Sequence, residues 1–319
     1  MSSNIKVMKL ALLLCLISLS MHQPVSKNTA DKKPKTIAVV LQKRVKAAGS
    51  DTVTIVKEKQ QWKAAQTAII ICDMWNQHWC KGATARVKEM APHMNNVLNA
   101  AREKGILIVH APSECMDHYK DHPGRKLAAK YAATQEISDG VSLLPSEQGA
   151  TWPVDQSNGG CNDTPRCEQH NPWTKETELI DIKDGDAISD AGNEIAGLLR
   201  DRNIDRVILM GVHTNMCIVN RTFGMRNMKR YGMQVVLMRD MTDAMYDSRQ
   251  APFVNHFQGL GMVIGYIETY IAPTMLSSDI TGGKPFRFAG DVRRETGDFV
   301  AGGSSPGPSF VGTTPSRGG

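Results

Sequence analysis

The sequence lacks several features that would point to particular classes of protein. Beyond the N-terminus no apolar run is long enough to span a bilayer, which favours a globular protein. Lys and Arg form no run interleaved with aromatic residues, and the formal net charge is only +6, so we do not expect nucleic acid as a partner. Gly-rich loops of the kind that cradle phosphates are absent, and we therefore expect no organic cofactor.

The N-terminus has the composition of a signal peptide. Lys6 and Lys9 precede the apolar run Leu10–Leu19, which is too short for a comfortable transmembrane helix. A small residue, Ser20, suits cleavage at the end of this segment. We predict a signal peptide over residues 1–20 and an exported protein, periplasmic or secreted, with no further membrane association. Lipidation at Cys15 and an uncleaved anchor are the alternatives.

Apolar runs then alternate with amphipathic stretches. The expected strands are Val53–Val56, Ala68–Cys72, Ile106–Val109, Leu179–Ile182, Val207–Met210 and Val235–Met238. The expected helices are Ala83–Lys104, Lys126–Ala133, Ala191–Arg200 and Asn215–Arg230. This alternation predicts an α/β fold, in which a mainly parallel sheet is covered by helices on both faces.

Composition suggests where the folded domain begins and ends. Residues 21–50 are polar and Lys-rich and are interpreted as a linker. The domain is predicted over residues 51–278, with a long insertion at 111–175 of the kind that usually serves a site. Residues 279–319 are rich in Gly, Ser and Pro, and we expect this tail to be disordered.

Export would permit disulfide bonds among the cysteines that remain after the leader is removed. Cys161 and Cys167 lie close together in a Gly, Asn and Pro-containing loop, and we predict a disulfide between them. Cys80 and Cys115 each follow the end of an expected strand, but the sequence leaves open whether they pair. Cys72 stands within an apolar strand and is expected to pack in the core.

Three reactive side chains follow strand ends. Ligands of open parallel sheets bind beyond the carboxyl ends of the strands, where Asp73, Lys183 and Cys217 are all expected. Cys217 would begin a helix, where free N–H groups and the Lys183 ammonium favour a thiolate, and Asp73 would be its base. The same N–H groups would stabilise an oxyanion.

The segment Gly211-Val212-His213-Thr214-Asn215-Met216-Cys217 resembles the Gly-Val-x-Thr-x-x-Cys signature of the isochorismatase-like cysteine hydrolases, a family that includes nicotinamidases. The resemblance covers roughly Thr67 to Thr274. It implies a three-layer α/β/α, Rossmann-like fold with a six-stranded sheet and a catalytic triad of Asp73, Lys183 and Cys217. It also implies an oxyanion hole at Cys217 beside a cis peptide bond between Val212 and His213. Unlike the family's lysine, Lys183 is not followed by aromatic residues.

Nicotinamidases hold a metal with an Asp-x-His pair and further histidines, and no such pair follows Asp73. The histidines His78, His110, His118 and His122 match no zinc signature, so no metal site is predicted. A substrate pocket is expected from aromatic and polar residues near Asp73 and in the insertion. These residues are Trp75, His78, Trp79, His170, Trp173 and Asn215.

Together these features predict an exported cysteine hydrolase that cleaves a small amide through a covalent intermediate on Cys217. The alternatives are vinyl-ether hydrolysis, as in isochorismate-cleaving relatives, and a noncatalytic protein that binds a small ligand. For the site itself, the alternative is a Cys–His pair, in which His110 or His213 would be the base that activates Cys217. The expected partner is a small-molecule substrate, and assembly into a homo-oligomer is left open.

Overall fold

The computed structural model describes residues 34–47, 49, 52–132 and 142–291. The predicted signal peptide, residues 21–33 of the predicted linker and residues 292–319 of the predicted tail lie outside the described residues. Within the described ranges, no helix has both the length and the apolar character that crossing a membrane requires.

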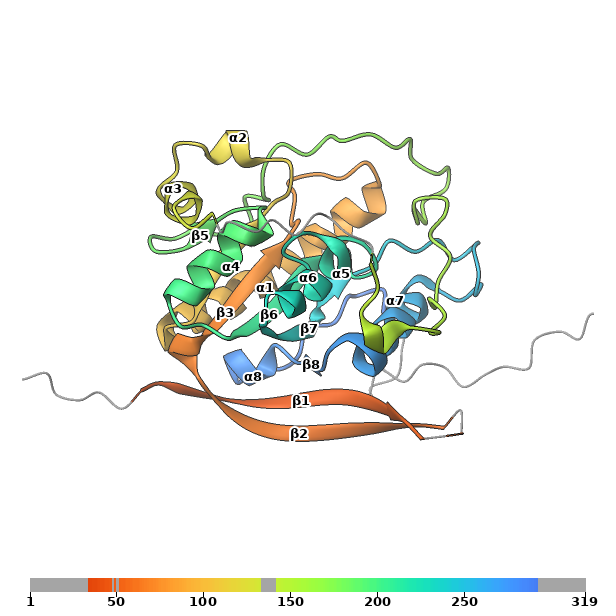
Figure 1. Ribbon diagram of the computed structural model, residues 1–319. Coiled ribbons are helices and arrows are strands. Elements are labelled where there is room, and N and C mark those ends of the chain that lie inside the picture. Colours follow the sequence, from red (N-terminus) through yellow and green to blue (C-terminus); the bar gives the residue numbers. More distant parts are fainter. Residues whose placement is uncertain (1–33, 48, 50–51, 133–141, 292–319) are drawn as a thin grey trace, which may run out of the picture. The chain divides into compact units, whose positions relative to one another are not determined.

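One sheet holds the strands of the described part of the chain, in the order β2-β1-β8-β7-β6-β3-β4-β5 (Figure 1). In chain order they are β1 (Thr36–Lys46), β2 (Val53–Lys63), β3 (Thr67–Cys72), β4 (Leu107–Ala111), β5 (Ala187–Ile188), β6 (Arg206–Val212), β7 (Gln234–Asp243) and β8 (Thr274–Met275). The six neighbours from β8 to β5 are parallel, which confirms the predicted fold class.

The two remaining strands form an antiparallel hairpin at the edge of the sheet. β1 falls within the stretch predicted to be a linker, so that prediction is corrected. In β1, buried residues such as Ile37 and Val39 alternate with exposed ones, as expected for a strand with one face against the core. The alternation is masked in the sequence by the Lys and Arg residues around it.

Helices cover both faces of the parallel strands (Figure 1). The helices are α1 (Lys81–Lys104), α2 (Met116–Tyr119), α3 (Pro123–Ala129), α4 (Gly192–Asp201), α5 (Cys217–Asn220), α6 (Met225–Arg230), α7 (His256–Tyr266) and α8 (Ser278–Thr281). In β3, Ile69 and Ile71 pack into the core beneath α1 and α8, whereas Ala68 and Ile70 pack beneath α4, α6 and α7. A strand covered on both faces needs a continuous apolar run, which explains why β3 is easily predicted.

The expected strand Leu179–Ile182 is not formed. The Asp181 N–H donates to the side chain of Asn95 at 3.2 Å, and its carbonyl accepts from Arg102 at 2.8 Å. The backbone there bonds to side chains of α1 instead of a neighbouring strand, and the short strand β5 pairs with β4 in its place. The residue that follows the carboxyl end of β5 is Ser189. Lys183 therefore does not follow the end of a strand.

Two other boundaries differ from expectation. The helix expected over Asn215–Arg230 is interrupted, because α5 ends at Asn220 and α6 begins only at Met225. The folded domain also extends past residue 278, since Phe286 and Phe288 are buried in the core beside α1.

Candidate active site

Cys217 is the first residue of α5, immediately beyond the carboxyl end of β6. The Val212–His213 peptide bond in the turn before it is cis, as the family resemblance implies. Gly211 has φ of +112°, and a Cβ at that position would lie 2.1 Å from the carbonyl oxygen of Cys72. Glycine therefore allows the end of β6 to approach the end of β3, and brings the turn of Cys217 beside Asp73.

Neighbouring backbone holds this turn in place. Thr214 donates its N–H to the carbonyl of Asp243 at 2.8 Å. The Asn215 side chain bonds both backbone groups of Met245, at 2.8 and 2.9 Å, and donates to Gln156. Asn215 was expected to bind substrate, but the structure uses its amide to position the turn.

Asp73 is fully buried directly after β3, in a left-handed conformation with φ of +47°. One carboxylate oxygen accepts the N–H of Ser113 at 2.8 Å, and the other lies 3.3 Å from Arg221 Nε. The carboxylate is also hydrogen bonded to the Cys217 side chain. Two of the three expected catalytic residues are thus brought together.

Two opposing effects act on the Asp73 carboxyl. Burial raises its pKa, whereas Arg221 and the hydrogen bonds from Cys217 and Ser113 lower it, and the net shift is upward. A carboxylate with a raised pKa is a better base than a solvated one, so Asp73 is suited to accept a proton from Cys217.

The cation beside Asp73 is Arg221, which the sequence interpretation missed. Besides Asp73, its guanidinium reaches Glu114 at 3.5 Å, and the side chain is only 22% exposed. These carboxylates raise the pKa of Arg221 further, although burial opposes them. The available signal was spacing, because Arg221 follows Cys217 by four residues, about one helical turn.

Lys183 is not part of this cluster. Its ammonium lies 3.0 Å from Asp181, and its side chain is 53% exposed. The expectation that Lys183 joins Asp73 and Cys217 therefore departs from the structure, because the strand that Lys183 was expected to end is not formed.

Aromatic side chains form a wall next to Cys217. Trp75 and Trp173 stack with ring centroids 4.3 Å apart, and Cys217 packs against the cluster that contains them. His78 stacks on Trp173 at 5.7 Å and contacts Trp79 at 5.2 Å. The expected pocket residues from the two segments thus meet.

Two imidazoles continue this wall. The rings of His78 and His213 lie 4.9 Å apart in an edge-on arrangement. Burial lowers the pKa of His213 well below its ordinary value and, together with Arg86, lowers that of His78 to about 4. Both rings are therefore neutral near pH 7, and the buried Nε2 of His213 has no hydrogen-bond partner within the described part of the chain.

The other histidines lie apart from Cys217. His110 is buried, with its ring nitrogens 2.7 Å from Glu176 and 3.3 Å from Asp186. His118 lies on α2, and His122 directly precedes α3. His170 is exposed, with its ring bonded to the carbonyl of Glu168. The hydrogen bond of Cys217 to Asp73 favours the carboxylate over His110 as the base.

The predicted Cys161–Cys167 disulfide is not formed in the structure, where the cysteines of the described ranges are free. Cys161 Sγ instead lies 2.9 Å from Cys80 Sγ. Cys115 packs with Trp75 and does not reach Cys80. Cys72 is fully buried, as expected, and its thiol also bonds to Cys217.

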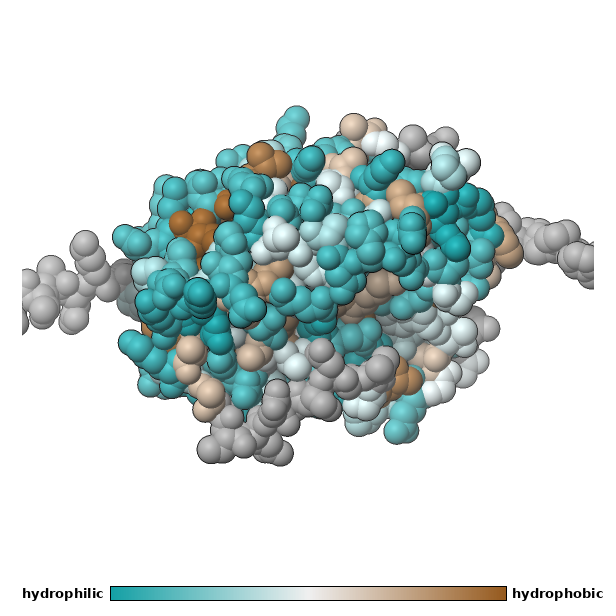
Figure 2. All heavy atoms as spheres, turned by 90° about the horizontal axis from the view of Figure 1, so that it is seen from above, coloured by the Kyte–Doolittle hydropathy of each residue, from teal (hydrophilic) through white to brown (hydrophobic). Residues whose placement is uncertain are grey.

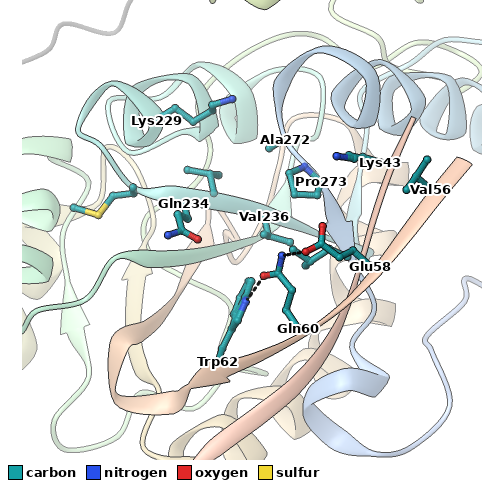
Figure 3. Close-up of a pocket in the computed structure, with 13 residues that line it drawn as sticks. Lys43, Val56, Glu58, Gln60, Trp62, Lys229, Gln234, Val236, Ala272 and Pro273 are labelled. Carbon is teal, nitrogen blue, oxygen red and sulfur yellow. Dashed lines mark hydrogen bonds between the residues drawn. The ribbon is translucent and has the colours of Figure 1, made fainter. Parts of the chain in front are cut away.

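The surface also has a hollow far from these residues. A cavity of about 420 Å³ lies between the hairpin and the amino end of β7, with Trp62, Glu58 and Lys229 among its lining residues (Figure 3). It is at the opposite end of the parallel strands from Asp73 and Cys217. Seen from above, the face of the molecule is mostly hydrophilic, with only small separate apolar spots (Figure 2).

Comparisons with known proteins relate this chain to one protein family. Residues 67–267 match the family model of the isochorismatase domain. No curated protein matches the chain. Among solved structures, a cysteine hydrolase from Pseudomonas syringae pv. phaseolicola is 15% identical, with 69% of this chain and 93% of that chain covered and a TM-score of 0.43. A pyrazinamidase of Pyrococcus horikoshii in complex with zinc is 18% identical, with 66% and 98% covered and a TM-score of 0.38. An isochorismatase from Pseudomonas putida is 14% identical, with 68% and 91% covered and a TM-score of 0.41.

Proposed function

This chain belongs to the isochorismatase domain family and is a hydrolase, and we propose that it cleaves the C–N bond of a small amide through a covalent intermediate on Cys217. The observation that carries the proposal is the placement of Cys217 beside the buried Asp73 carboxylate, beyond the carboxyl ends of the neighbouring strands β6 and β3. A carboxylate in this position is a base within reach of the thiol proton.

The reaction proceeds in two halves. Asp73 takes the proton of the Cys217 thiol while the sulfur attacks the carbonyl carbon of the amide. Collapse of the tetrahedral intermediate breaks the C–N bond, and Asp73 returns the proton to the leaving nitrogen. Water then attacks the thioester, with Asp73 accepting its proton, and release of the carboxylic acid restores the Cys217 thiol.

Charge stabilisation comes from two sources. Arg221 holds a permanent positive charge beside Asp73 and Cys217, and so favours the anionic form of the Asp73 carboxyl. The N–H groups of Met216 and Ile218 donate to the carbonyl of His213, whereas no described backbone bond uses the N–H of Cys217 between them. That N–H is therefore placed to bind the oxyanion.

The wall beside Cys217 suits a small ligand with an apolar body and one polar group. Trp75 and Trp173 offer the apolar surface. The unpartnered Nε2 of His213 offers a single hydrogen bond in an otherwise buried environment. Because the imidazole is neutral, it favours an uncharged polar group over a carboxylate.

The test is ammonia release from a panel of small primary amides, nicotinamide included, by wild type and Cys217→Ala. Cys115→Ala is the matched control, because Cys115 belongs to the apolar cluster against which Cys217 packs. Its thiol has no part in the proposed reaction. We expect release to disappear in Cys217→Ala and to persist in the control. When wild type is quenched during turnover, mass spectrometry of the intact protein should show one added acyl group. Peptide mapping should then locate this group on Cys217.

Each other outcome has a distinct meaning. If no amide is cleaved while Cys217 reacts rapidly with iodoacetamide at neutral pH, the amide substrate is wrong, and enol ethers are the next class to assay. If Cys217 is inert to iodoacetamide, its role as a nucleophile is wrong, and a noncatalytic binding protein becomes the better description.

A further inference from the structure

Three cysteines gather around one carboxylate where the insertion meets α1. The Sγ atoms of Cys80, Cys161 and Cys167 lie 3.4, 3.6 and 3.3 Å from the same oxygen, Oδ2 of Asp163. Cys80 directly precedes α1, whereas the other three residues come from the insertion. Four potential ligands from two distant segments therefore converge, although the proposed hydrolysis uses none of them.

We propose that Cys80, Cys161, Cys167 and Asp163 bind a zinc ion. Three thiolates and a carboxylate are ligands that tetrahedral zinc accepts in proteins. With ordinary zinc–sulfur and zinc–oxygen bonds, a tetrahedral site separates sulfur from oxygen ligands by about 3.5 Å. The three sulfur–oxygen distances at Asp163 bracket that value.

Two adjustments complete the site when the ion enters. Cys80 Sγ and Cys161 Sγ lie 2.9 Å apart, whereas sulfur ligands of tetrahedral zinc are separated by about 3.8 Å. A movement of roughly 1 Å, shared between these two side chains, is the first adjustment. Cys167 has to move as well, because only Cys80, Cys161 and Asp163 have ligand atoms that all lie within 4.8 Å of one another. The three sulfur–oxygen edges need no such change.

The first turn of α1 supplies an environment for negative ligands. Gly82 donates its N–H to Asp163 Oδ2 at 2.9 Å, and the N–H of Lys81 donates to Cys167. These N–H groups are at the positive end of a helix dipole. A Cβ on Gly82 would lie 2.6 Å from the Asp163 carboxylate, so glycine is needed for this close approach.

Burial and charge also favour a cation. Cys80 and Cys161 are almost completely buried, and Cys167 is half-buried. The Asp163 carboxylate is the acceptor that all three thiols face. A bound divalent cation displaces thiol protons and neutralises the charge, whereas a disulfide would leave the third thiol against the carboxylate.

A site with four protein ligands has no open position, which is typical of structural zinc. It would fix Cys161 and Cys167 of the insertion to the start of α1. Trp79 and Met216, which precede Cys80 and Cys217 in the chain, pack against the same cluster. The zinc would therefore stabilise the wall of the active site without contacting substrate. Its thiolate ligands distinguish it from the histidine-rich metal site of nicotinamidases.

The experiment measures the zinc content of the full-length protein, purified without chelators, by inductively coupled plasma mass spectrometry. We expect one zinc per chain in wild type, loss of zinc in Cys161→Ser, and weakened retention against a chromogenic chelator in Asp163→Asn. Cys115→Ser is the matched control and should keep its zinc. As a measurement that does not depend on how the variants fold, wild type is also reconstituted with Co²⁺, whose absorption spectrum should show sulfur-to-metal charge transfer and tetrahedral bands.

Three results would overturn the proposal. A peptide map that shows a Cys80–Cys161 disulfide in metal-free protein would replace the zinc with a crosslink. Three titratable free thiols without metal would make the cluster a packing feature. Zinc that persists in Cys161→Ser, or a cobalt spectrum without sulfur bands, would place the ion elsewhere. None of these depends on turnover of an amide, so the test is independent of the proposed function.

Discussion

Neutralising Arg221 is the sharpest test of how the site is built. Arg221 places a guanidinium 3.3 Å from the buried Asp73 carboxylate, where the sequence interpretation expected the ammonium of Lys183. We predict that Arg221→Gln loses most activity and that the acid limb of its pH–rate profile moves to higher pH. The second effect follows because burial, which raises the pKa of Asp73, is then unopposed by the main effect that lowers it.

The expected magnitudes can be worked out separately. At 3.3 Å and an effective dielectric constant of about 20, Coulomb's law gives about 5 kcal/mol for the pair, which is an upper bound because Arg221 is 22% exposed. Carboxyls next to an arginine usually have pKa values lowered by about 1–3 units, and we expect the acid limb to shift by that amount. Loss of the positive charge near the developing oxyanion should reduce kcat/KM by about 10²–10³-fold at the plateau.

The assay is kcat/KM against pH for the best amide of the panel, with the rate of iodoacetamide labelling of Cys217 as a readout that needs no substrate. Arg125→Gln is the matched control, because Arg125 is 19% exposed and pairs with Glu194 at 2.6 Å, away from the site. Arg221→Lys should retain part of the activity, because lysine keeps the positive charge but lacks the planar guanidinium. A wild-type plateau and an unmoved acid limb in Arg221→Gln would refute this account.

Two further predictions concern residues outside the cluster. Lys183→Met should leave kcat/KM unchanged, because Lys183 is half exposed and pairs with Asp181; a large loss of activity would return Lys183 to the catalytic set. Burial alone would lower the pKa of His110, but Glu176 and Asp186 outweigh it and raise the pKa to about 9. A raised pKa contributes stability that is fully present below the unfolded value of about 6.5 and is lost as pH rises through about 9. Urea unfolding should therefore show this loss in wild type and a flatter profile in His110→Gln; identical profiles would contradict the assignment.

Much of the fold and half of the site follow from short stretches of sequence. The central strands β3 and β6 are covered on both faces, so each must be a continuous apolar run, and such runs are visible without a structure. Asp73 and Cys217 follow these two strands, and neighbouring parallel strands present their carboxyl ends at one edge. Their proximity is therefore predictable from order and pattern alone.

The third member of the site was not predictable in the same way. The run Leu179–Ile182 has the composition of a strand, but its backbone is held by Asn95 and Arg102, two side chains that are distant in sequence. The real strand, β5, contributes only two residues and carries no periodic signal. An error in one strand therefore moved the expected cation to Lys183. The absence of aromatic residues after Lys183 was the one local sign of the error.

An arginine beside Asp73 also decides which group can move protons. A lysine ammonium can release its proton in a buried site, whereas a guanidinium remains charged throughout the reaction. In the proposed mechanism, Asp73 is therefore the residue that exchanges a proton with Cys217. Burial raises the pKa of the carboxyl, and Arg221 is the strongest of the effects that lower it, so the two oppose each other. The left-handed backbone of Asp73 and its bond from Ser113 keep the carboxylate where both effects act on it.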